Sequence, residues 1–328
     1  MKKTVRIGTR DSQLAVWQAT LVQKELAKSS IESELVYLKS DGDMDLVTPL
    51  YEMGVQGIFT KTLDAALLNN RIDIAVHSMK DVPTQLAKGL QQVAVLPRAS
   101  FKDILVYRGD EAALFTELGF VNGQWAMNNN SKFIPRFAGQ NSKLKIATSS
   151  VRRRAQWLNR YPDHTLDNLR GNVNTRIRKL DESEWNGAIF AAAGLERIGL
   201  RPENSIDLDW MLPAPSQGAI TIVCREADDH SAEACYVLND PATAACTKIE
   251  KDFMRVLMGG CSTPISALAI QQGDNIFFRG NILSLDGKEK AEIAYTVAVS
   301  ETDNLGTLAA QELLEKGGDK IIATIRNA

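Results

Sequence analysis

The sequence predicts an α/β protein with more than one domain. Strand-like and helix-like patterns alternate through the first eighty residues, and the alternation resumes after residue 143. The chain has 328 residues, which exceeds the ~250–300 residues at which a single hydrophobic core stops growing. The last ninety residues contain a long helix followed by a run of strands, which is typical of a small α+β unit.

The first group of elements follows a βαβαβ order. Residues 5–8 read as a strand, and Ser12 is placed to cap a helix whose apolar residues recur on neighbouring turns. Residues 34–38 read as a second strand, residues 59–68 as a helix and residues 72–76 as a third strand. This order predicts a parallel sheet, in which ligands bind beyond the carboxyl ends of the strands.

A second group begins with a strand at residues 103–107. The glycine and asparagine content of residues 109–142 predicts an inserted loop. Three strand–helix units then predict a second α/β domain, and they comprise residues 143–148 with 151–160, 165–169 with 173–180, and 188–192 with 194–198.

The remaining elements return to the first domain and then build a third. Residues 218–224 read as a strand that rejoins the first sheet, and residues 243–258 read as an amphipathic helix ended by Gly259 and Gly260. The small α+β unit is completed by strands at 265–270, 276–285 and 291–299, a helix capped by Asp303, and a final strand at 320–325.

Composition limits the possible classes of function. With 44% apolar residues, a net charge of −2 and a pI near 6.0, the chain is unlike general nucleic-acid binders, whose domains are strongly basic. We find no secretory segment and no apolar run approaching the ~20 residues that span a bilayer. We therefore expect a cytoplasmic protein without a membrane segment. No metal-ligand spacing is present, and free thiols are expected at Cys224, Cys235, Cys246 and Cys261.

The most informative stretch is a local excess of positive charge. Residues 143–179 hold ten basic residues, seven of them arginine, against only Asp163 and Asp167. Arginine presents a rigid fork of donors that fits carboxylates and phosphates. This window therefore predicts a binding site for a polyanion, and the alternative is a solvated basic face.

Two arginine groups lie where a predicted strand turns into a helix. Ser149, Ser150, Arg152 and Arg153 occupy the first such junction, and Arg170 with Gly171 occupies the next. Free backbone N–H groups at helix starts bind anions, so we expect both junctions to open into one cleft.

Two further residues remain ambiguous when each is considered alone. Asp81 follows the strand at 72–76, where a carboxylate could transfer protons or stabilise a cation, or could simply form a turn before Pro83. Cys261 follows a helix end, whose dipole disfavours a thiolate. A single covalent attachment and a buried inert thiol are both open for this cysteine.

Five short motifs, taken together, resemble one family. They occur in the order and spacing of the porphobilinogen deaminase (hydroxymethylbilane synthase) family, and they are residues 10–15 (RDSQLA), 77–83 (HSMKDVP), 148–153 (TSSVRR), 169–173 (LRGNV) and 259–261 (GGC). The resemblance covers nearly the whole chain apart from residues 109–142.

The resemblance implies a fold, a reaction and a cofactor. The fold would be two α/β domains like those of periplasmic binding proteins around a cleft, plus a small α+β domain. Its boundaries would be 1–102 with 214–238, 103–213, and 239–328. The enzyme would be a transferase of heme biosynthesis that joins four porphobilinogen molecules into hydroxymethylbilane. The growing chain would hang from a dipyrromethane cofactor attached by a thioether to Cys261, and we expect a monomer.

The family's functional residues match positions of this chain. The resemblance implies that Asp81 is the catalytic acid. It implies cofactor contacts by Cys261, Lys80, Asp81, Ser149, Arg152, Arg153, Arg170 and Gly171. It implies substrate contacts by Arg10, Ser12, Lys61, Ser150, Arg176 and Gln217. Two loop positions depart from the family pattern, because Gln56 and Asp41 stand where basic residues are usual.

Two other classes of function are weighed against this one. A non-enzymatic binder of anionic solutes would share the two-domain cleft but would need neither Cys261 nor Asp81. A nucleic-acid binder would use the arginine window but would need interleaved aromatic residues, and only Trp157 and Tyr161 lie there.

Overall fold

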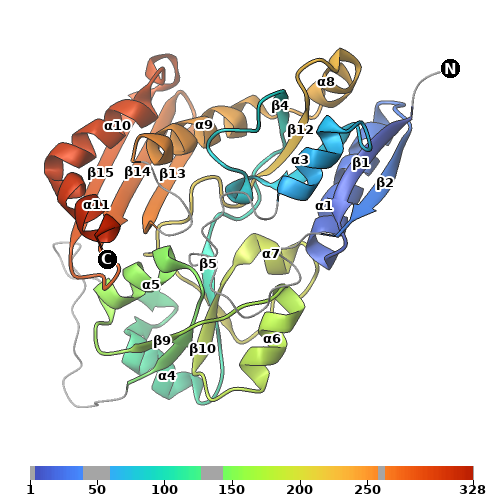
Figure 1. The fold of residues 1–328 in the computed structure, drawn as a ribbon. Coiled ribbons are helices and arrows are strands. Elements are labelled where there is room, and N and C mark those ends of the chain that lie inside the picture. Colours follow the sequence, from blue (N-terminus) through green and yellow to red (C-terminus); the bar gives the residue numbers. More distant parts are fainter. Residues whose placement is uncertain (1–3, 40–59, 127–142, 258–262, 328) are drawn as a thin grey trace.

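The structure of the chain is a computed structural model that describes residues 4–39, 60–126, 143–257 and 263–327. Three groups of elements are visible in Figure 1, one around each of three sheets, with the second sheet below the other two. Gln56 and Asp41, which depart from the family pattern, lie outside the described residues, as do Cys261 and the two glycines before it.

The first sheet has the order β2-β1-β3-β12-β4. β1 is parallel to β2 and β3, whereas β12 is antiparallel to both of its neighbours. The predicted return of the chain to this sheet is therefore confirmed, but the sheet is mixed rather than parallel throughout. Its strands are β1 (Val5–Arg10), β2 (Ser33–Leu38), β3 (Ile74–Ser78), β4 (Leu90–Val95) and β12 (Ile220–Arg225).

Helices cover both faces of the first sheet because its strands alternate apolar side chains between the two faces. Ile74 and Val76 pack against α1 (Gln13–Lys28), and Ala75 between them packs on the opposite face with α3 (Lys61–Leu68). A third helix, α8 (Asp229–Tyr236), follows β12.

The second sheet has the order β11-β5-β10-β8-β9 and is also mixed. Its strands are β5 (Asp103–Tyr107), β8 (Lys145–Ala147), β9 (Thr165–Asp167), β10 (Gly187–Ala191) and β11 (Ser205–Asp207). The helices packed on it are α4 (Glu111–Leu118), α5 (Val151–Arg160), α6 (Val173–Asp181) and α7 (Ala192–Glu196).

The prediction of a loop over residues 109–142 is wrong for the part that the structure describes. Asp110 caps α4 by accepting hydrogen bonds from Ala112 and Ala113, and Gly119 ends it in the left-handed conformation. A hairpin of β6 (Phe120–Val121) and β7 (Gln124–Trp125) follows. Its aromatic rings pack against the core of the second sheet, so residues 111–125 belong to the fold.

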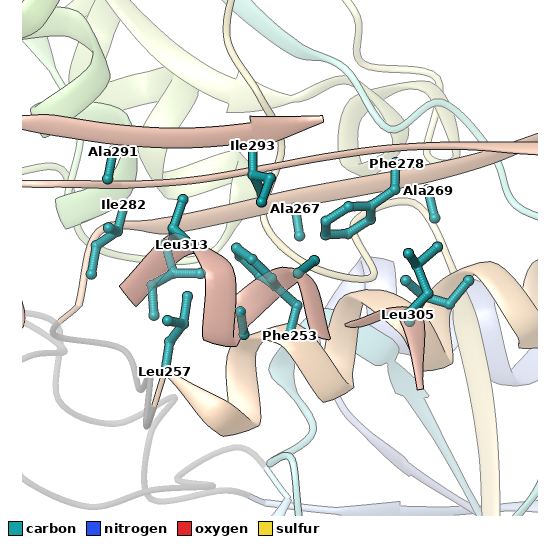
Figure 2. Packing of buried hydrophobic residues seen from close by; sticks show 14 of the residues in the cluster. Phe253, Leu257, Ala267, Ala269, Phe278, Ile282, Ala291, Ile293, Leu305 and Leu313 are labelled. Carbon is teal, nitrogen blue, oxygen red and sulfur yellow. The ribbon is translucent and has the colours of Figure 1, made fainter. Parts of the chain in front are cut away.

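The C-terminal unit packs helices on one face of an antiparallel sheet. Figure 2 shows Phe253 and Phe278 at the centre of its core, with their ring centroids 5.3 Å apart. A Cβ at Gly280 would lie 2.5 Å from the Phe253 ring, so the ring occupies the space that a side chain would need. The elements are α9 (Pro241–Val256), β13 (Ile265–Gln272), β14 (Asn275–Leu283), β15 (Lys290–Ala298), α10 (Leu305–Leu313) and α11 (Asp319–Arg326).

Two predictions for this unit are wrong. Residues 319–326 form helix α11 instead of a final strand, and Ile321 on that helix is buried against the core. Asn304, not Asp303, precedes α10, and its side chain makes no capping hydrogen bond.

The chain passes between the first two sheets twice, and the two connections touch. The backbone N–H of Ala99 donates to the carbonyl of Gly218 at 3.1 Å. Gly218 has a φ of 89°, and a Cβ there would lie 2.7 Å from the carbonyl oxygens of Ala99 and Ser100. Only glycine therefore permits this approach.

A buried ion pair ties these connections to the C-terminal unit. Arg98 donates to both carboxylate oxygens of Glu250 on α9, at 2.6 and 3.1 Å. Glu250 also accepts from the backbone N–H groups of Ser216 and Ala269. The domain boundaries given in the sequence analysis stay a prediction. The assignment of the strands to three sheets, and the positions of the connections between those sheets, support them.

Candidate active site

A cavity of about 800 Å³ lies between the first and second sheets. This volume falls within the ~300–1,000 Å³ typical of ligand pockets. Twelve of the fourteen predicted site residues line it, namely Arg10, Ser12, Lys80, Asp81, Ser149, Ser150, Arg152, Arg153, Arg170, Gly171, Arg176 and Gln217. These residues follow the carboxyl ends of β1, β3, β8 and β9 or lie on the connection between β11 and β12, as expected of two junctions that open into one cleft. Their roles in binding and catalysis stay a prediction.

The other two predicted residues are not part of this lining. Lys61 is the first residue of α3, is exposed, and does not line the cavity. Cys261 lies outside the described residues.

The starts of α5 and α6, which face the cavity, are capped by side chains of the residues directly before them. The Ser150 hydroxyl accepts from the Arg153 N–H at the start of α5, and Asn172 accepts from the Thr175 N–H at the start of α6. Gly171 has a φ of 115°, and a Cβ there would lie 2.7 Å from the Thr175 side chain. Ser12 occupies the capping position of α1, as predicted, but its side chain makes no capping hydrogen bond.

A buried carboxylate that the sequence reasoning missed organises the arginine pair. Asp103, the first residue of β5, accepts from Arg152 at 2.7 Å through one oxygen. Its other oxygen accepts from Nε and Nη2 of Arg153 at 3.0 and 2.7 Å. Arg152 and Arg153 are themselves only 5% and 6% exposed. The sequence did contain a signal for Asp103, which is an acidic residue at the start of an apolar strand in a domain with an excess of basic residues.

The environment of Asp103 keeps it ionised. Burial by itself raises the pKa of this carboxyl, but the charges of Arg152 and Arg153 outweigh that effect and bring its pKa well below the ordinary value. Burial also lowers the pKa of Arg152. The triad thus presents one net positive charge in a nearly water-free setting.

Gln217 connects the arginine triad to the opposite side of the cavity. Its Nε2 donates to Asp103 at 2.9 Å and to the carbonyl of Phe101 at 2.8 Å. Its Oε1 accepts from Lys80 Nζ at 3.4 Å. Lys80 belongs to the first sheet and Asp103 to the second, so this amide joins the two walls of the site.

Asp81 ends a short 3-10 turn, Met79–Asp81, directly after β3. The turn is fixed at its start because the Met79 N–H donates to the carbonyl of Ala219 at 3.0 Å. At its end, Lys251 of α9 donates to the carbonyl of Val82. The Asp81 side chain is exposed to the cavity, opposite the arginine junctions. Lys251 is the second residue that the sequence reasoning missed, because nothing local to α9 relates it to residue 82.

The cations of the cavity are partly desolvated. Burial lowers the pKa of Lys80 to about 8, with Arg153 adding to the effect and Asp81 opposing it. Burial, together with the neighbouring charges of Arg153 and Arg170, lowers the pKa of Arg176 to about 10. These groups repel one another across the cavity, and an anionic ligand would relieve that repulsion.

Comparisons with known proteins agree with the geometry. A family model described as "Porphobilinogen deaminase, dipyromethane cofactor binding domain" matches residues 5–233, and one described as "Porphobilinogen deaminase, C-terminal domain" matches residues 244–315. The porphobilinogen deaminase of Pelobacter propionicus is 38% identical over 327 residues, which cover 98% of this chain and 97% of the relative. That of Acidithiobacillus ferrooxidans is 37% identical over 333 residues, covering 100% of both chains.

The chain belongs to the porphobilinogen deaminase family.

Membership confirms the predicted family, its enzymatic activity and its place in tetrapyrrole biosynthesis. It also confirms the dipyrromethane cofactor at the level of the family, because the matched domain is named for binding it. Among solved structures, the chain is similar to the periplasmic VFT2 domain of BvgS from Bordetella pertussis, at 11% identity and a TM-score of 0.40, covering 74% of this chain and 91% of that one. No helix in the described ranges is long and apolar enough to cross a membrane.

Proposed function

We propose that the cavity between the two sheets is where this family member joins four porphobilinogen molecules head to tail into hydroxymethylbilane. In this proposal the dipyrromethane is attached to Cys261, and Asp81 is the catalytic carboxylate. The observation that carries the proposal is the convergence of Arg10, Arg170, Arg176 and the Arg152–Arg153 pair on the same cavity as Asp81.

The charge of the cavity fits the proposed cofactor. Seven cations line it, namely Arg10, Lys39, Lys80, Arg152, Arg153, Arg170 and Arg176. Two acids, Asp11 and Asp81, line it with them, and Asp103 neutralises one arginine from behind. Among the described residues, cations therefore outnumber carboxylates around the cavity. Each pyrrole ring carries one acetate and one propionate, so a chain of pyrroles suits this excess of positive charge.

The three described cysteines are poorly suited to attachment of the cofactor, which supports attachment at Cys261. Cys224, Cys235 and Cys246 are buried and free. Burial raises the pKa of Cys224 to about 11 and that of Cys235 to about 12, and it also raises the pKa of Cys246. Because the thiolate is the nucleophile, such thiols react poorly. Helix α9 ends at Val256, five residues before Cys261, beside the wall of the cavity that carries Asp81.

Asp81 is proposed to stabilise positive charge on the substrate. Loss of ammonia from porphobilinogen leaves an electron-poor pyrrole. Its methylene carbon forms a bond to an unsubstituted α-carbon of another pyrrole, which places positive charge on the ring nitrogens. The charge disappears when that α-carbon loses its proton, a loss that Asp81 is proposed to assist. When bound, the dipyrromethane supplies the terminal pyrrole carbon to which the first substrate is joined. A fixed carboxylate favours these charged states over the neutral ground state, which lowers the barrier. The arginines hold the carboxylates of the rings and so orient them toward Asp81.

Lys61 is proposed as a substrate contact only by its match to the family, because it does not line the cavity. A monomeric state and a cytoplasmic location also stay predictions. Sedimentation of the purified protein at several concentrations tests the first. A monomer gives the mass of one chain, 36.1 kDa before any attached group is added, at every concentration.

Two measurements test the proposal. Intact mass spectrometry of the purified enzyme should show an adduct of two pyrrole units that Cys261→Ser lacks and that the matched control Cys246→Ser retains. Holo Asp81→Asn should then lose turnover by ~10²–10³-fold in single-turnover kinetics, because a well-placed electrostatic group has been removed. Full activity without any adduct would contradict the role of Cys261. Elongation by Asp81→Asn within threefold of the unaltered enzyme would contradict that of Asp81.

A further inference from the structure

One face of helix α9 lies against the turn that carries Asp81. Ala244 on α9 packs against the small buried cluster of Met79, Val95 and Ala219. Lys251 lies seven residues further along, two turns away on the same face, and its Nζ donates to the carbonyl of Val82. Figure 1 shows α9 between the C-terminal sheet and the first sheet. This helix therefore packs against the cluster that contains Met79 and donates to the carbonyl of Val82, so its contacts lie on both sides of Asp81 in the sequence.

The surroundings of Lys251 direct its charge toward Asp81. The charged and titratable groups that act on it or are acted on by it are Asp81, Glu250, His77 and, across His77, Arg10. Glu250 is already balanced by Arg98 and by two backbone N–H groups. His77 is buried and neutral, since burial lowers its pKa to about 3. Among the described residues, Asp81 is the carboxylate that remains for the Lys251 ammonium to stabilise.

We propose that Lys251 is a positioning residue for Asp81: it holds the turn that carries Asp81 through its hydrogen bond to the carbonyl of Val82. The inference rests on the proposed catalytic role of Asp81 and extends it to a residue of the C-terminal unit. Lys251 precedes Cys261 by ten residues on the same stretch of chain. The helix that leads to the proposed attachment point thus also fixes the carboxylate that acts on the attached chain.

The charge of Lys251 changes within an accessible pH range. Burial lowers its pKa to about 8, against the opposing effects of Asp81 and Glu250. The ammonium is therefore present below pH 8 and is lost as the pH rises through that value. Lys80 has a similarly lowered pKa. We therefore expect turnover to decline at alkaline pH as both lysines lose their charge, and substitution of Lys251 separates its contribution from that of Lys80.

Three variants of the full-length holoenzyme test the inference. Lys251→Met removes the charge and the donor but keeps the length of the side chain. Lys251→Arg keeps a charge that does not titrate below pH 12. Lys248→Met is the matched control, because Lys248 lies three residues earlier on α9, is exposed, and pairs only with Asp252 among the described residues.

We expect Lys251→Met to lower kcat by about tenfold, the effect of losing one cation near a carboxylate at the surface of a cavity. Its KM should stay within twofold, and the part of the alkaline decline that Lys251 causes should be absent from its pH–rate profile. Lys251→Arg should keep most of kcat and show a smaller alkaline decline than the unaltered enzyme. Lys248→Met should match the unaltered enzyme throughout.

Intact mass separates this inference from the proposed function. An unaltered enzyme without the adduct would overturn the proposed function itself. If the adduct is present, and if Lys251→Met keeps kcat and the alkaline limb of the profile within twofold, Lys251 is only a packing contact. If Lys251→Met does not load the cofactor, the pH–rate profile of Lys251→Arg is the test of the inference. An alkaline decline identical to that of the unaltered enzyme would then overturn the inference.

Discussion

Arg153 on α5 and Arg176 on α6 belong to consecutive strand–helix units of the same sheet, and both line the same cavity. Their partners differ. Arg153 donates twice to the buried Asp103 and once to the carbonyl of Ile189. Arg176 donates to the carbonyl of Gly171 at 2.7 Å, and no described carboxylate lies within ion-pair distance of it. One arginine is held mainly by the protein, whereas the charge of the other is available to a ligand.

The same basic window contains two further kinds of arginine. Arg160 is buried over the rings of Trp210 and Trp125, at 4.8 and 5.6 Å from their centroids. Arg154 is exposed and contacts only the carbonyl of Leu166 among the described residues. The arginines of one basic window therefore have different roles. Arg153 forms an internal ion pair and Arg160 stacks on aromatic rings, whereas Arg176 is placed to bind a ligand and Arg154 is solvated.

The largest expected effect follows from removing the carboxylate of the paired arginines. Asp103→Asn leaves Arg152 and Arg153 buried without a counter-charge, which should lower the free energy of unfolding by ~3–5 kcal/mol. Urea denaturation measures this, with the exposed Asp163→Asn as the matched control. A loss below 1 kcal/mol would mean that the two arginines do not need Asp103.

A smaller effect, on binding rather than stability, is expected at Arg176. Arg176→Met removes a charge-assisted contact with a ligand carboxylate, worth ~1.5–3 kcal/mol, so KM for porphobilinogen should rise by ~10–150-fold. The free energy of unfolding should change by less than ~1 kcal/mol, because a desolvated charge is removed and only the half-buried carbonyl of Gly171 loses its donor. Arg178→Met, exposed on the same helix, is the control for both steady-state kinetics and urea denaturation. An unchanged KM would mean that Arg176, like Arg153, is held mainly by the protein and not by a ligand.

The smallest effect is expected at Arg160. Its stacking over two tryptophans should be worth ~1–2 kcal/mol, so Arg160→Met should be less stable by that amount and keep its KM. Arg154→Met on the same helix should remain within ~0.5 kcal/mol of the unaltered protein. Thermal unfolding followed by near-ultraviolet circular dichroism reports on the tryptophans directly. A rise in KM for Arg160→Met would show that the stack also shapes the cavity.

Much of the fold followed from local pattern. The helix predicted at residues 151–160 has the same bounds in the structure, and the strand at residues 218–224 does return to the first sheet. The errors arose where local signals conflict. Residues 320–325 are rich in isoleucine, which favours strands, but Ile321, Ile322 and Ile325 fall on one helical face and pack on the core as α11. Glycines after residue 118 suggested a loop and hid α4 and its aromatic hairpin.

The sequence predicted which residues would gather around the cavity, but not the hydrogen bonds and ion pairs that hold them in place. Strand ends, helix starts and the family motifs predicted twelve of the fourteen residues around one cavity. Asp103 and Lys251 escaped because their partners are distant in sequence. Asp103 is 49 residues from Arg152, and Lys251 is 169 residues from Val82. Contacts of that kind depend on how the sheets and α9 are packed together, which no spacing within a motif contains.

The touching connections at Gly218 have a mechanical consequence. With Ala99 bonded to Gly218 and no room there for a side chain, the two sheets share a narrow pivot. A rotation that separates the two walls would break the 3.4 Å contact between Lys80 and Gln217. Arg98, the residue before Ala99, anchors α9 through Glu250 beside these connections. Lys251 directly follows Glu250, so the contact that holds the Asp81 turn lies next to the ion pair at this junction of the three sheets.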